Sequence, residues 1–209
     1  MQVRNLEQAI QELVSIDDIT RWSVTQLNQS DVYYGHGTDN PIDETRALLS
    51  FVLQLTTAQL AAMGHCRMLN SEKQEFVELL KQRVEQHIPA AYLTHQAWFA
   101  GLPFYVDERV LVPRSPIAEL IENGFQTWLV EAPHRVLDLC TGGGCIAIAC
   151  AYAFPEAEVD ALDISTEALE VAEFNIEQHG LTHRVTPIQS DLFDAVKAEK
   201  YDLIVTNPP

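Results

Sequence analysis

Apolar residues in the first ninety positions recur with the period of a helix. One set falls on a single helical face, is interrupted by Asp17-Asp18, and then resumes; its members are Leu6, Ile10, Leu13 and Val14 before the acidic pair, and Ile19 and Trp22 after it. Apolar side chains three or four positions apart line one side of a helix. The N-terminal part of the chain is therefore predicted to consist of amphipathic helices.

Polar residues and prolines indicate where further helices of this region begin and end. Asn40-Pro41 stands ahead of an apolar run, which is a helix start signal. Ser71 and Gln74 have the spacing of a capping box. The helix after them is predicted to bury a stripe and to end at a proline; these residues are Phe76, Leu79, Leu80, Val84, Ile88 and Pro89. Residues 1–90 are thus predicted to form a small helical domain, either for substrate recognition or for packing alone.

The hydrophobic pattern changes near Tyr92. Aromatic and β-branched residues stand on both sides of Ala100-Gly101, which predicts a β-hairpin. In the segment "VLVPRSP" that follows, Ser115 suits the N-cap and Pro116 the first position of a helix that runs towards Val130. We expect residues 91–114 to form a hairpin linker and residues 115–209 to form the C-terminal domain.

From residue 134 onward, short apolar runs alternate with helical patterns. Strands are predicted at 135–139, 159–162, 185–188 and 201–206, and helices at 145–154 and 166–179, the second closed by Gly180. This alternation predicts an α/β fold with a parallel, doubly wound sheet. Ligands of such sheets bind beyond the carboxyl ends of the strands, and each motif described below falls at such an end.

Composition narrows the class of protein. The 209 residues are 47% hydrophobic and 21% charged, as expected of a globular chain. The net charge of −17 argues against direct nucleic-acid recognition, which relies on basic patches that neutralise phosphates. The acidity suits a basic protein partner, or it only maintains solubility.

The sequence contains no signal for secretion, for a membrane span or for a metal site. The four cysteines form no C-x-x-C pair, no secretory segment is recognisable, and the histidines lack metal-ligand spacing. The longest apolar stretch, Cys145 to Phe154, is far shorter than the ~20 residues that cross a bilayer. We expect a cytoplasmic protein without a metal.

The first motif is a glycine-rich turn in "VLDLCTGGGCIAIA". Asp138 ends the first predicted strand, and Gly142, Gly143 and Gly144 lead directly into a helix. Glycines permit positive φ and the close approach of a ligand, and the helix start offers free N–H groups. Because the spacing is not the G-x-G-x-x-G of dinucleotide sites, the turn alone indicates only a nucleotide-like ligand.

Acidic residues follow the next two predicted strands. Asp163 could accept both hydroxyls of a ribose, and Ser165 can cap the next helix. Asp191 could accept a hydrogen bond from an adenine amino group, with Leu192 against the ring. Each aspartate taken alone also fits an ordinary turn.

The fourth motif, Thr206-Asn207-Pro208-Pro209, follows the fourth predicted strand. The prolines lack N–H groups and restrict the backbone, so the Asn207 side chain and nearby carbonyls face outward as hydrogen-bond acceptors. Such acceptors can hold an –NH2 group. The alternative for an isolated Asn-Pro pair is a strand-ending turn.

The motifs "DLCTGGG", "LDIS", "SDLF" and "TNPP", in this order, resemble class I methyltransferases that use S-adenosylmethionine. "NPP" resembles the start of the NPPY motif of enzymes that methylate planar amino or amide nitrogens. The helical domain, "AAYLTH", the hairpin and "LVPR" narrow the resemblance to the protein N(5)-glutamine methyltransferases, which are HemK-like. "LVPRSPIAELI", with Cys140 where a glycine is more usual, is similar to the branch that modifies large-subunit ribosomal protein uL3. The resemblance covers nearly the whole chain.

The resemblance implies methylation of a glutamine side-chain amide and a role for each motif. Asn207 and Pro208 would be catalytic, and Asn207, Pro208 and Pro209 would hold the glutamine. S-adenosylmethionine would be held by Asp138, Cys140, Thr141, Gly142, Gly143, Gly144, Asp163, Ile164, Asp191, Leu192 and Asn207. Acceptors on both N–H groups would align the nitrogen and stabilise its developing positive charge, so no separate general base is expected.

Two departures from the family pattern affect these expectations. Cys140 is tolerable if its position does not need positive φ, and its thiol is expected to be packed rather than nucleophilic. The aromatic residue after "NPP" and further strands of the family's sheet are missing. We therefore expect a fragment of a longer protein, with little activity on its own and an exposed sheet edge.

Three other functions stay open at this point. Release-factor methyltransferases share the chemistry but carry a P-R-P-D-T-E type sequence at the linker. Adenine N6-methyltransferases share the cradle for an amino group, but the charge of −17 speaks against them. A truncated chain could also bind the cofactor without transferring a methyl group.

Overall fold

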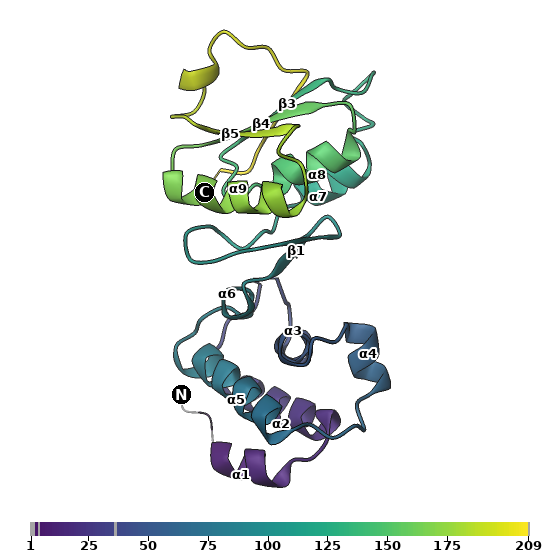
Figure 1. Cartoon of the computed structure of the whole chain (residues 1–209), viewed down its shortest axis with the longest axis vertical. Helices are drawn as coiled ribbons and strands as arrows, with labels where there is room; N and C mark the ends of the chain where they lie inside the picture. The colour runs from purple at the N-terminus through teal and green to yellow at the C-terminus, as the bar shows by residue number, and fades with distance from the viewer. Residues whose placement is uncertain (1–2, 4, 36, 209) are drawn as a thin grey trace. The chain divides into compact units, whose positions relative to one another are not determined.

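The computed structural model describes residues 3, 5–35 and 37–208. The chain divides into two compact units, residues 1–94 and 95–209. Each unit has its own hydrophobic core, and Figure 1 shows their elements. Pro209, which was predicted to hold the glutamine, lies outside the described residues.

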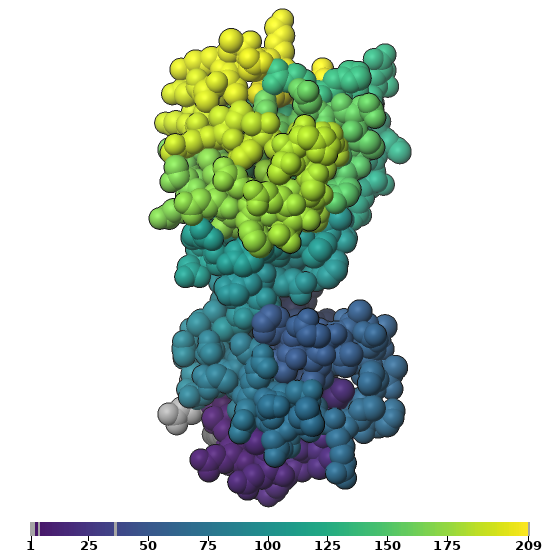
Figure 2. Space-filling model, viewed as in Figure 1, coloured from purple at the N-terminus to yellow at the C-terminus, as the bar shows by residue number. Residues whose placement is uncertain are grey.

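The first unit is built of helices, as predicted. They are α1 (Leu6–Glu12), α2 (Ile16–Gln29), α3 (Pro41–Leu53), α4 (Thr57–Ala62), α5 (Asn70–Glu85) and α6 (Ala90–Thr94). Their apolar faces enclose a core that includes Ile19, Leu48, Phe76 and Leu80, all fully buried. Figure 2 shows the purple residues of α1 beside the blue residues of α5, and these two helices are in contact.

The start of α2 differs from the sequence prediction. Asp17 and Asp18 do not interrupt a helix but lie in its first turn, where Ser15 and Asp18 form a capping box. Carboxylates are favourable at this end because the first N–H groups of a helix are unpaired. The break lies instead at residues 13–15, between α1 and α2.

Helix α5 also starts earlier than predicted. The backbone N–H of Leu69 donates to the Glu72 carboxylate over 2.6 Å, and the helix begins at Asn70. The predicted capping box of Ser71 and Gln74 is therefore wrong. At its other end α5 stops short of the proline that was expected to end it.

One ion pair is buried inside the first unit. Glu44 of α3 and Arg83 of α5 form a salt bridge, and each side chain is at most 3% exposed. The remaining groups of the pair are also satisfied, since Arg83 donates to the Tyr33 carbonyl and Glu44 accepts from the Thr38 hydroxyl. Buried charges are tolerated only when paired in this way.

The second unit is an α/β structure with a parallel sheet, as predicted. Its elements are β1 (Ala97–Phe99), β2 (Leu102–Phe104), α7 (Ile117–Glu122), β3 (Arg135–Leu139), α8 (Cys145–Ala153), β4 (Glu158–Asp163), α9 (Thr166–Gln178), β5 (Val185–Gln189), the 3-10 turn η1 (Asp194–Val196) and β6 (Leu203–Thr206). The sheet has the order β5-β4-β3-β6. Helices α7, α8 and α9 lie on one face of it (Figure 1). A cluster on the sheet consists of Leu137, Leu139, Leu162 and Val196.

The predicted hairpin is confirmed. Strands β1 and β2 pair antiparallel around Ala100 and Gly101, which both have positive φ. Phe99 and Phe104 are buried and belong to the core of the second unit. The hairpin is therefore packed on the α/β unit.

Helix α7 is shorter than predicted and does not reach Val130. It ends at Glu122, because Gly124 and Phe125 follow with φ of 60° and 51°. Its start also differs from the prediction, since Pro116 and not Ser115 is the N-cap and the helix begins at Ile117. The Ser115 hydroxyl still accepts a hydrogen bond from the Ile117 N–H over 3.3 Å.

The order of the strands reverses at β3. The chain runs outward from β3 to β4 and β5, and then crosses back so that β6 pairs with the other side of β3. Leu139 is in register with both Leu162 and Thr206, so the carboxyl ends of β3, β4 and β6 lie level. In open α/β sheets, ligands bind where the strand order reverses, which here is between β3 and β6.

Candidate active site

The side chain of Asp138 in β3 stabilises the loop between β3 and α8 through hydrogen bonds. Asp138 is fully buried, and its Oδ2 accepts from the Thr141 hydroxyl over 2.6 Å and from the Ala147 N–H over 3.0 Å. Its Oδ1 has no hydrogen-bond partner among the described residues. Burial, and to a smaller extent the Asp163 carboxylate, raise the pKa of Asp138 to about 7 although the two hydrogen bonds lower it.

The backbone of this loop is left-handed at three positions. Gly142 and Gly144 have φ of 54° and 80°, and a Cβ on Gly144 would lie 3.2 Å from the Cβ of Ala172 in α9. Cys140 also has a positive φ, of 63°. A cysteine was expected to be tolerable here only if the position did not need positive φ, so the backbone of Cys140 is strained. Burial, and then Asp163, raise the pKa of the Cys140 thiol, which fits a packed, protonated side chain.

Asp163 connects the end of β4 to the glycine loop. Its Oδ2 accepts from the Gly142 N–H over 2.9 Å, and its Oδ1 accepts from the Ser165 N–H over 3.0 Å. Ser165 caps α9, as predicted, by accepting from the Ala168 N–H. Asp163 therefore lies beside the loop with both oxygens facing backbone N–H groups.

Sequence reasoning missed Asn175, which fixes the same loop from α9. Asn175 is 1% exposed, and its Nδ2 donates to the carbonyls of Gly143 over 2.9 Å and of Tyr105 over 3.0 Å. Its Oδ1 accepts from the Tyr105 N–H over 2.8 Å. A polar residue within the buried stripe of a helix is the signal that could have identified it.

The segment after the hairpin also reaches the loop. A Cβ on Gly143 would lie 3.6 Å from Cγ2 of Val110. Next to Val110, Arg109 forms ion pairs with Asp107 over 2.7 Å and with Glu170 of α9 over 2.9 Å. The Arg109 guanidinium lowers the pKa of Asp107 to about 2. This segment is thus anchored to α9 at the place where it passes the glycine loop.

Two apolar side chains lie exposed at the ends of β4 and β5. Ile164 is 65% exposed and Leu192 is 55% exposed, and each directly follows an aspartate. The Ser190 N–H donates to the Asp163 carbonyl, which places the start of the Asp191 turn beside β4. Exposed apolar surface with a few polar groups beside it suits a nucleoside ligand. The residues present therefore fit S-adenosylmethionine, which supplies an activated methyl group when bound.

Asn207 lies at the tip of β6, across the strand reversal from the glycine loop. The Thr206 hydroxyl donates to the Leu139 carbonyl over 2.7 Å, which fixes the strand end against β3. The exposed Asn207 accepts at Oδ1 from the Ser115 hydroxyl over 3.2 Å. Pro208 follows and is exposed.

The described residues of the predicted site thus gather at one edge of the sheet. Hydrogen bonds and strand register connect residues 138–144, 163–164 and 190–192, and β6 brings residues 207–208 beside them. Among the described residues, no three His, Cys, Asp or Glu side chains are arranged to hold a metal ion. In the same part of the chain, no helix is both long and apolar enough to span a bilayer.

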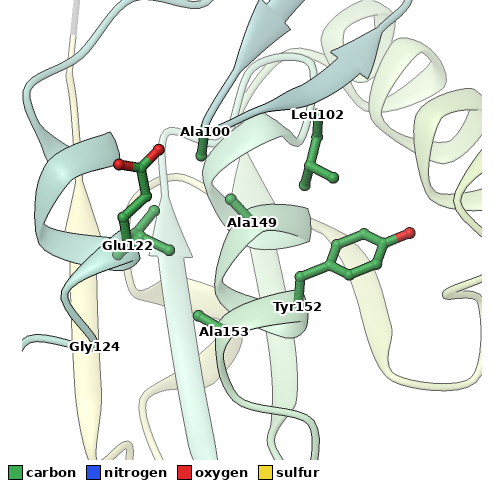
Figure 3. A pocket seen from close by; sticks show the side chains of 8 residues that line it. Ala100, Leu102, Glu122, Gly124, Ala149, Tyr152 and Ala153 are labelled. Atoms are coloured by element: carbon green, nitrogen blue, oxygen red, sulfur yellow. The ribbon is translucent and has the colours of Figure 1, made fainter.

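A separate pocket of about 320 Å³ lies between the hairpin, α7 and α8 (Figure 3). It is lined by Ala100, Leu102, Ile121, Glu122, Gly124, Ala149, Tyr152 and Ala153. Its α8 residues come from the second half of that helix, whereas the glycine loop precedes its first residue. The pocket is therefore distinct from the candidate active site.

Two family models match separate parts of the chain. Residues 121–209 match the family described as "Methyltransferase small domain", and residues 19–94 match "PrmC N-terminal domain". A solved structure described as ribosomal protein L11 methylase from Lactobacillus delbrueckii subsp. bulgaricus aligns at 30% identity over 49% of this chain and 51% of that chain, with a TM-score of 0.40. The second unit is a methyltransferase domain of the α/β class.

Two relatives cover almost the whole chain. Both are described as ribosomal protein uL3 glutamine methyltransferase, one from Neisseria meningitidis serogroup B and one from Neisseria gonorrhoeae. Each is 48% identical over 204 residues, which is 97% of this chain and 67% or 68% of the relative. The chain belongs to the ribosomal protein uL3 glutamine methyltransferase family.

Proposed function

We propose that the protein transfers a methyl group from S-adenosylmethionine to the side-chain amide nitrogen of a glutamine in ribosomal protein uL3. The observation that carries this proposal is the strand reversal between β3 and β6, because the glycine loop and Asn207 follow the carboxyl ends of these two neighbouring parallel strands. A methyl donor and an acceptor amide must meet at such a place for direct transfer. The membership of the chain in the uL3 family supports the choice of substrate.

Asn207 and Pro208 are assigned to the acceptor amide. An amide nitrogen is a poor nucleophile, because its lone pair is delocalised into the carbonyl. The Asn207 Oδ1 and the Pro208 carbonyl accept its two N–H groups, which fixes the nitrogen and stabilises the positive charge that develops on it. Methylation replaces one hydrogen of the amide, and that proton leaves to water without an assigned general base.

The cofactor is assigned to the glycine loop after β3 and to the carboxyl ends of β4 and β5, across the strand reversal from β6. The residues proposed to contact it are those of the glycine loop together with Asp163, Ile164, Asp191, Leu192 and Asn207. Asp138 is assigned an indirect role in cofactor binding, because its hydrogen bonds stabilise the glycine loop. Pro209, beside Pro208, is kept in the proposal as part of the glutamine cradle.

The helical region is assigned to recognition of uL3. The proposed boundaries are residues 1–90 for this domain, 91–114 for the hairpin linker and 115–209 for the methyltransferase domain. The separate family match of residues 19–94 supports a domain with its own role. We place the protein in the cytoplasm, where reducing conditions suit its free cysteines.

The test is transfer of labelled methyl groups by the full-length gene product. The acceptors are free uL3, a class I release factor and double-stranded DNA, each offered to the wild type and to the Asn207→Ala variant. Asn123→Ala is the matched control, because the exposed Asn123 side chain donates to the Glu119 carbonyl of α7 and has no other hydrogen-bond partner among residues 3, 5–35 and 37–208. Label on uL3 alone, lost with Asn207→Ala and kept with Asn123→Ala, is the expected result.

The other outcomes are equally informative. Label on the release factor would keep the reaction and overturn the substrate. Label on DNA would contradict both, since the group held at the end of β6 would then be a base amino group. The charge of −17 makes this last outcome unexpected, because phosphate binding depends on basic surface.

A further inference from the structure

Ser115 contacts Asn207 although the two residues are 92 positions apart. Its hydroxyl donates to Oδ1 of Asn207 over 3.2 Å and accepts from the Ile117 N–H over 3.3 Å. A serine hydroxyl has one proton and two acceptor positions, so both contacts can exist together. Ser115 therefore joins the first turn of α7 to the side chain at the tip of β6.

The backbone on each side of this contact is already restrained. Ser115 is followed by Pro116, whose φ is −63°, and Pro113 lies two residues before it. On the other strand, the Thr206 hydroxyl is bonded to the Leu139 carbonyl. The freedom that remains is the rotation of the exposed Asn207 side chain, and the hydrogen bond from Ser115 restricts it.

The direction of the hydrogen bond determines what Asn207 can offer. An asparagine side chain can turn either its oxygen or its NH2 group towards a partner. Donation by Ser115 fixes the oxygen towards α7 and uses one of its two lone pairs. The second lone pair stays available as an acceptor, which is what an amide N–H of the substrate needs.

We propose that Ser115 is a positioning residue for methyl transfer, which holds the Asn207 side chain with its oxygen ready to accept from the substrate amide. This inference rests on the proposed function and extends it to a residue that precedes the sheet. Ser115 acts through Asn207 and not on the methyl donor. Its loss should therefore lower kcat by more than it lowers the affinity for S-adenosylmethionine.

Three substitutions separate this role from a structural one. Ser115→Ala removes both hydrogen bonds. Ser115→Asp keeps an acceptor for the Ile117 N–H but has no proton to donate, and Ser115→Thr keeps the hydroxyl. We expect kcat on free uL3 to fall roughly five- to tenfold in the Ala and Asp variants, as for one net side-chain hydrogen bond, and to stay within about twofold in the Thr variant. The KM for uL3 and the calorimetric Kd for the cofactor should change less than about twofold, because neither ligand binds to Ser115 in this proposal.

A second readout does not depend on activity. In ¹⁵N-labelled protein, the side-chain NH2 resonance of Asn207 is identified by its loss in Asn207→Asp. It should move in the Ala and Asp variants of Ser115 and stay in place in the Thr variant. An unmoved resonance in Ser115→Ala would show that the contact is absent in solution and overturn the proposal.

The kinetic outcomes are also decisive. Wild-type kcat in Ser115→Ala or in Ser115→Asp would overturn the positioning role, and so would a Thr variant as slow as the Ala variant. Absence of methyl transfer to uL3 by the wild type would instead contradict the proposed function, and the role of Ser115 in that reaction with it. The NMR measurement would still report whether Ser115 and Asn207 are bonded.

Discussion

The side-chain amide of Asn175 donates to the carbonyl of Gly143 over 2.9 Å, so a residue in the last half of α9 fixes the loop that follows β3. The same side chain makes two hydrogen bonds to the backbone of Tyr105. The glycine loop is thus stabilised by hydrogen bonds to Asn175 in α9 as well as by those to Asp138 in β3.

Replacement of Asn175 by Ala should weaken cofactor binding. The variant leaves part-buried backbone groups of Tyr105 and Gly143 without this partner, which costs up to about 1–3 kcal/mol of unfolding free energy for each group. We expect the Kd for S-adenosylmethionine, measured by calorimetry, to rise about tenfold or more. Asn123→Ala, which removes a surface hydrogen bond of the same kind, should change neither quantity. Unchanged cofactor affinity in a folded Asn175→Ala protein would contradict the role of the loop in binding.

Replacement of Cys140 by Gly should stabilise the protein. Cys140 has φ of 63°, a region that costs a non-glycine residue roughly 1–2 kcal/mol. Glycine adopts this conformation freely, although its more flexible unfolded state offsets part of the gain. Denaturant unfolding should give an increase of up to about 1 kcal/mol. A lower unfolding free energy would mean that packing of the thiol outweighs the backbone strain.

The buried Asp138 predicts a particular dependence of stability on pH. Its pKa in the folded protein is raised to about 7 from a model-compound value of 3.8, mainly by burial. The folded state therefore binds more protons than the unfolded state between these values, and the contribution of Asp138 to stability falls as pH rises from about 4 to about 7.

The Asp138→Asn variant tests this dependence. Asparagine does not ionise, so the difference in unfolding free energy between the variant and the wild type should shift in favour of the variant as pH increases over that window. Chemical denaturation of both proteins at pH 5, 6 and 7.5 measures it. A difference that is independent of pH would show that Asp138 has the same pKa in the folded and the unfolded protein, and would contradict the raised pKa.

The buried ion pair of the helical unit should be costly to break. Glu44→Gln leaves Arg83 without its carboxylate in a site where both side chains are at most 3% exposed. Loss of one partner from a buried pair typically costs about 3–5 kcal/mol. Asp43→Asn is the control on the same helix, since the Asp43–Arg46 pair is about half exposed and should contribute less than ~1 kcal/mol. Equal losses of unfolding free energy in the two variants would contradict the special role of the buried pair.

Much of the fold could be predicted from local patterns. The strands at 135–139 and 185–188, the helix start at Asn40-Pro41, the Ser165 cap and the hairpin at Ala100-Gly101 each depend on residues close together in sequence, and the structure confirms them. Predictions that depended on competition between local signals were less reliable. At the start of α5 the Glu72 carboxylate captures the Leu69 N–H, so the helix begins before the Ser71 signal.

The arrangement of the site was predictable only in part. Parallel strands bring their carboxyl ends together, so the positions of Gly142, Asp163 and Asn207 at one edge could be anticipated. The support for these residues comes from distant segments and has no local pattern. Asn175 differs from a surface asparagine only through its position in a buried stripe, and the bond from Ser115 to Asn207 depends on the way α7 packs near the strand tip.

The order β5-β4-β3-β6 has a consequence for synthesis of the protein. During synthesis from the N-terminus, the glycine loop is made before β6, which pairs with one edge of β3. Thr206 of β6, which bonds to Leu139 of β3, lies 67 residues after it in the chain. Contacts over such separations form slowly, because a long loop must close before they are gained. The glycine loop and the tip of β6 are thus made at different times, and the site proposed for the acceptor amide is complete only when β6 pairs with β3.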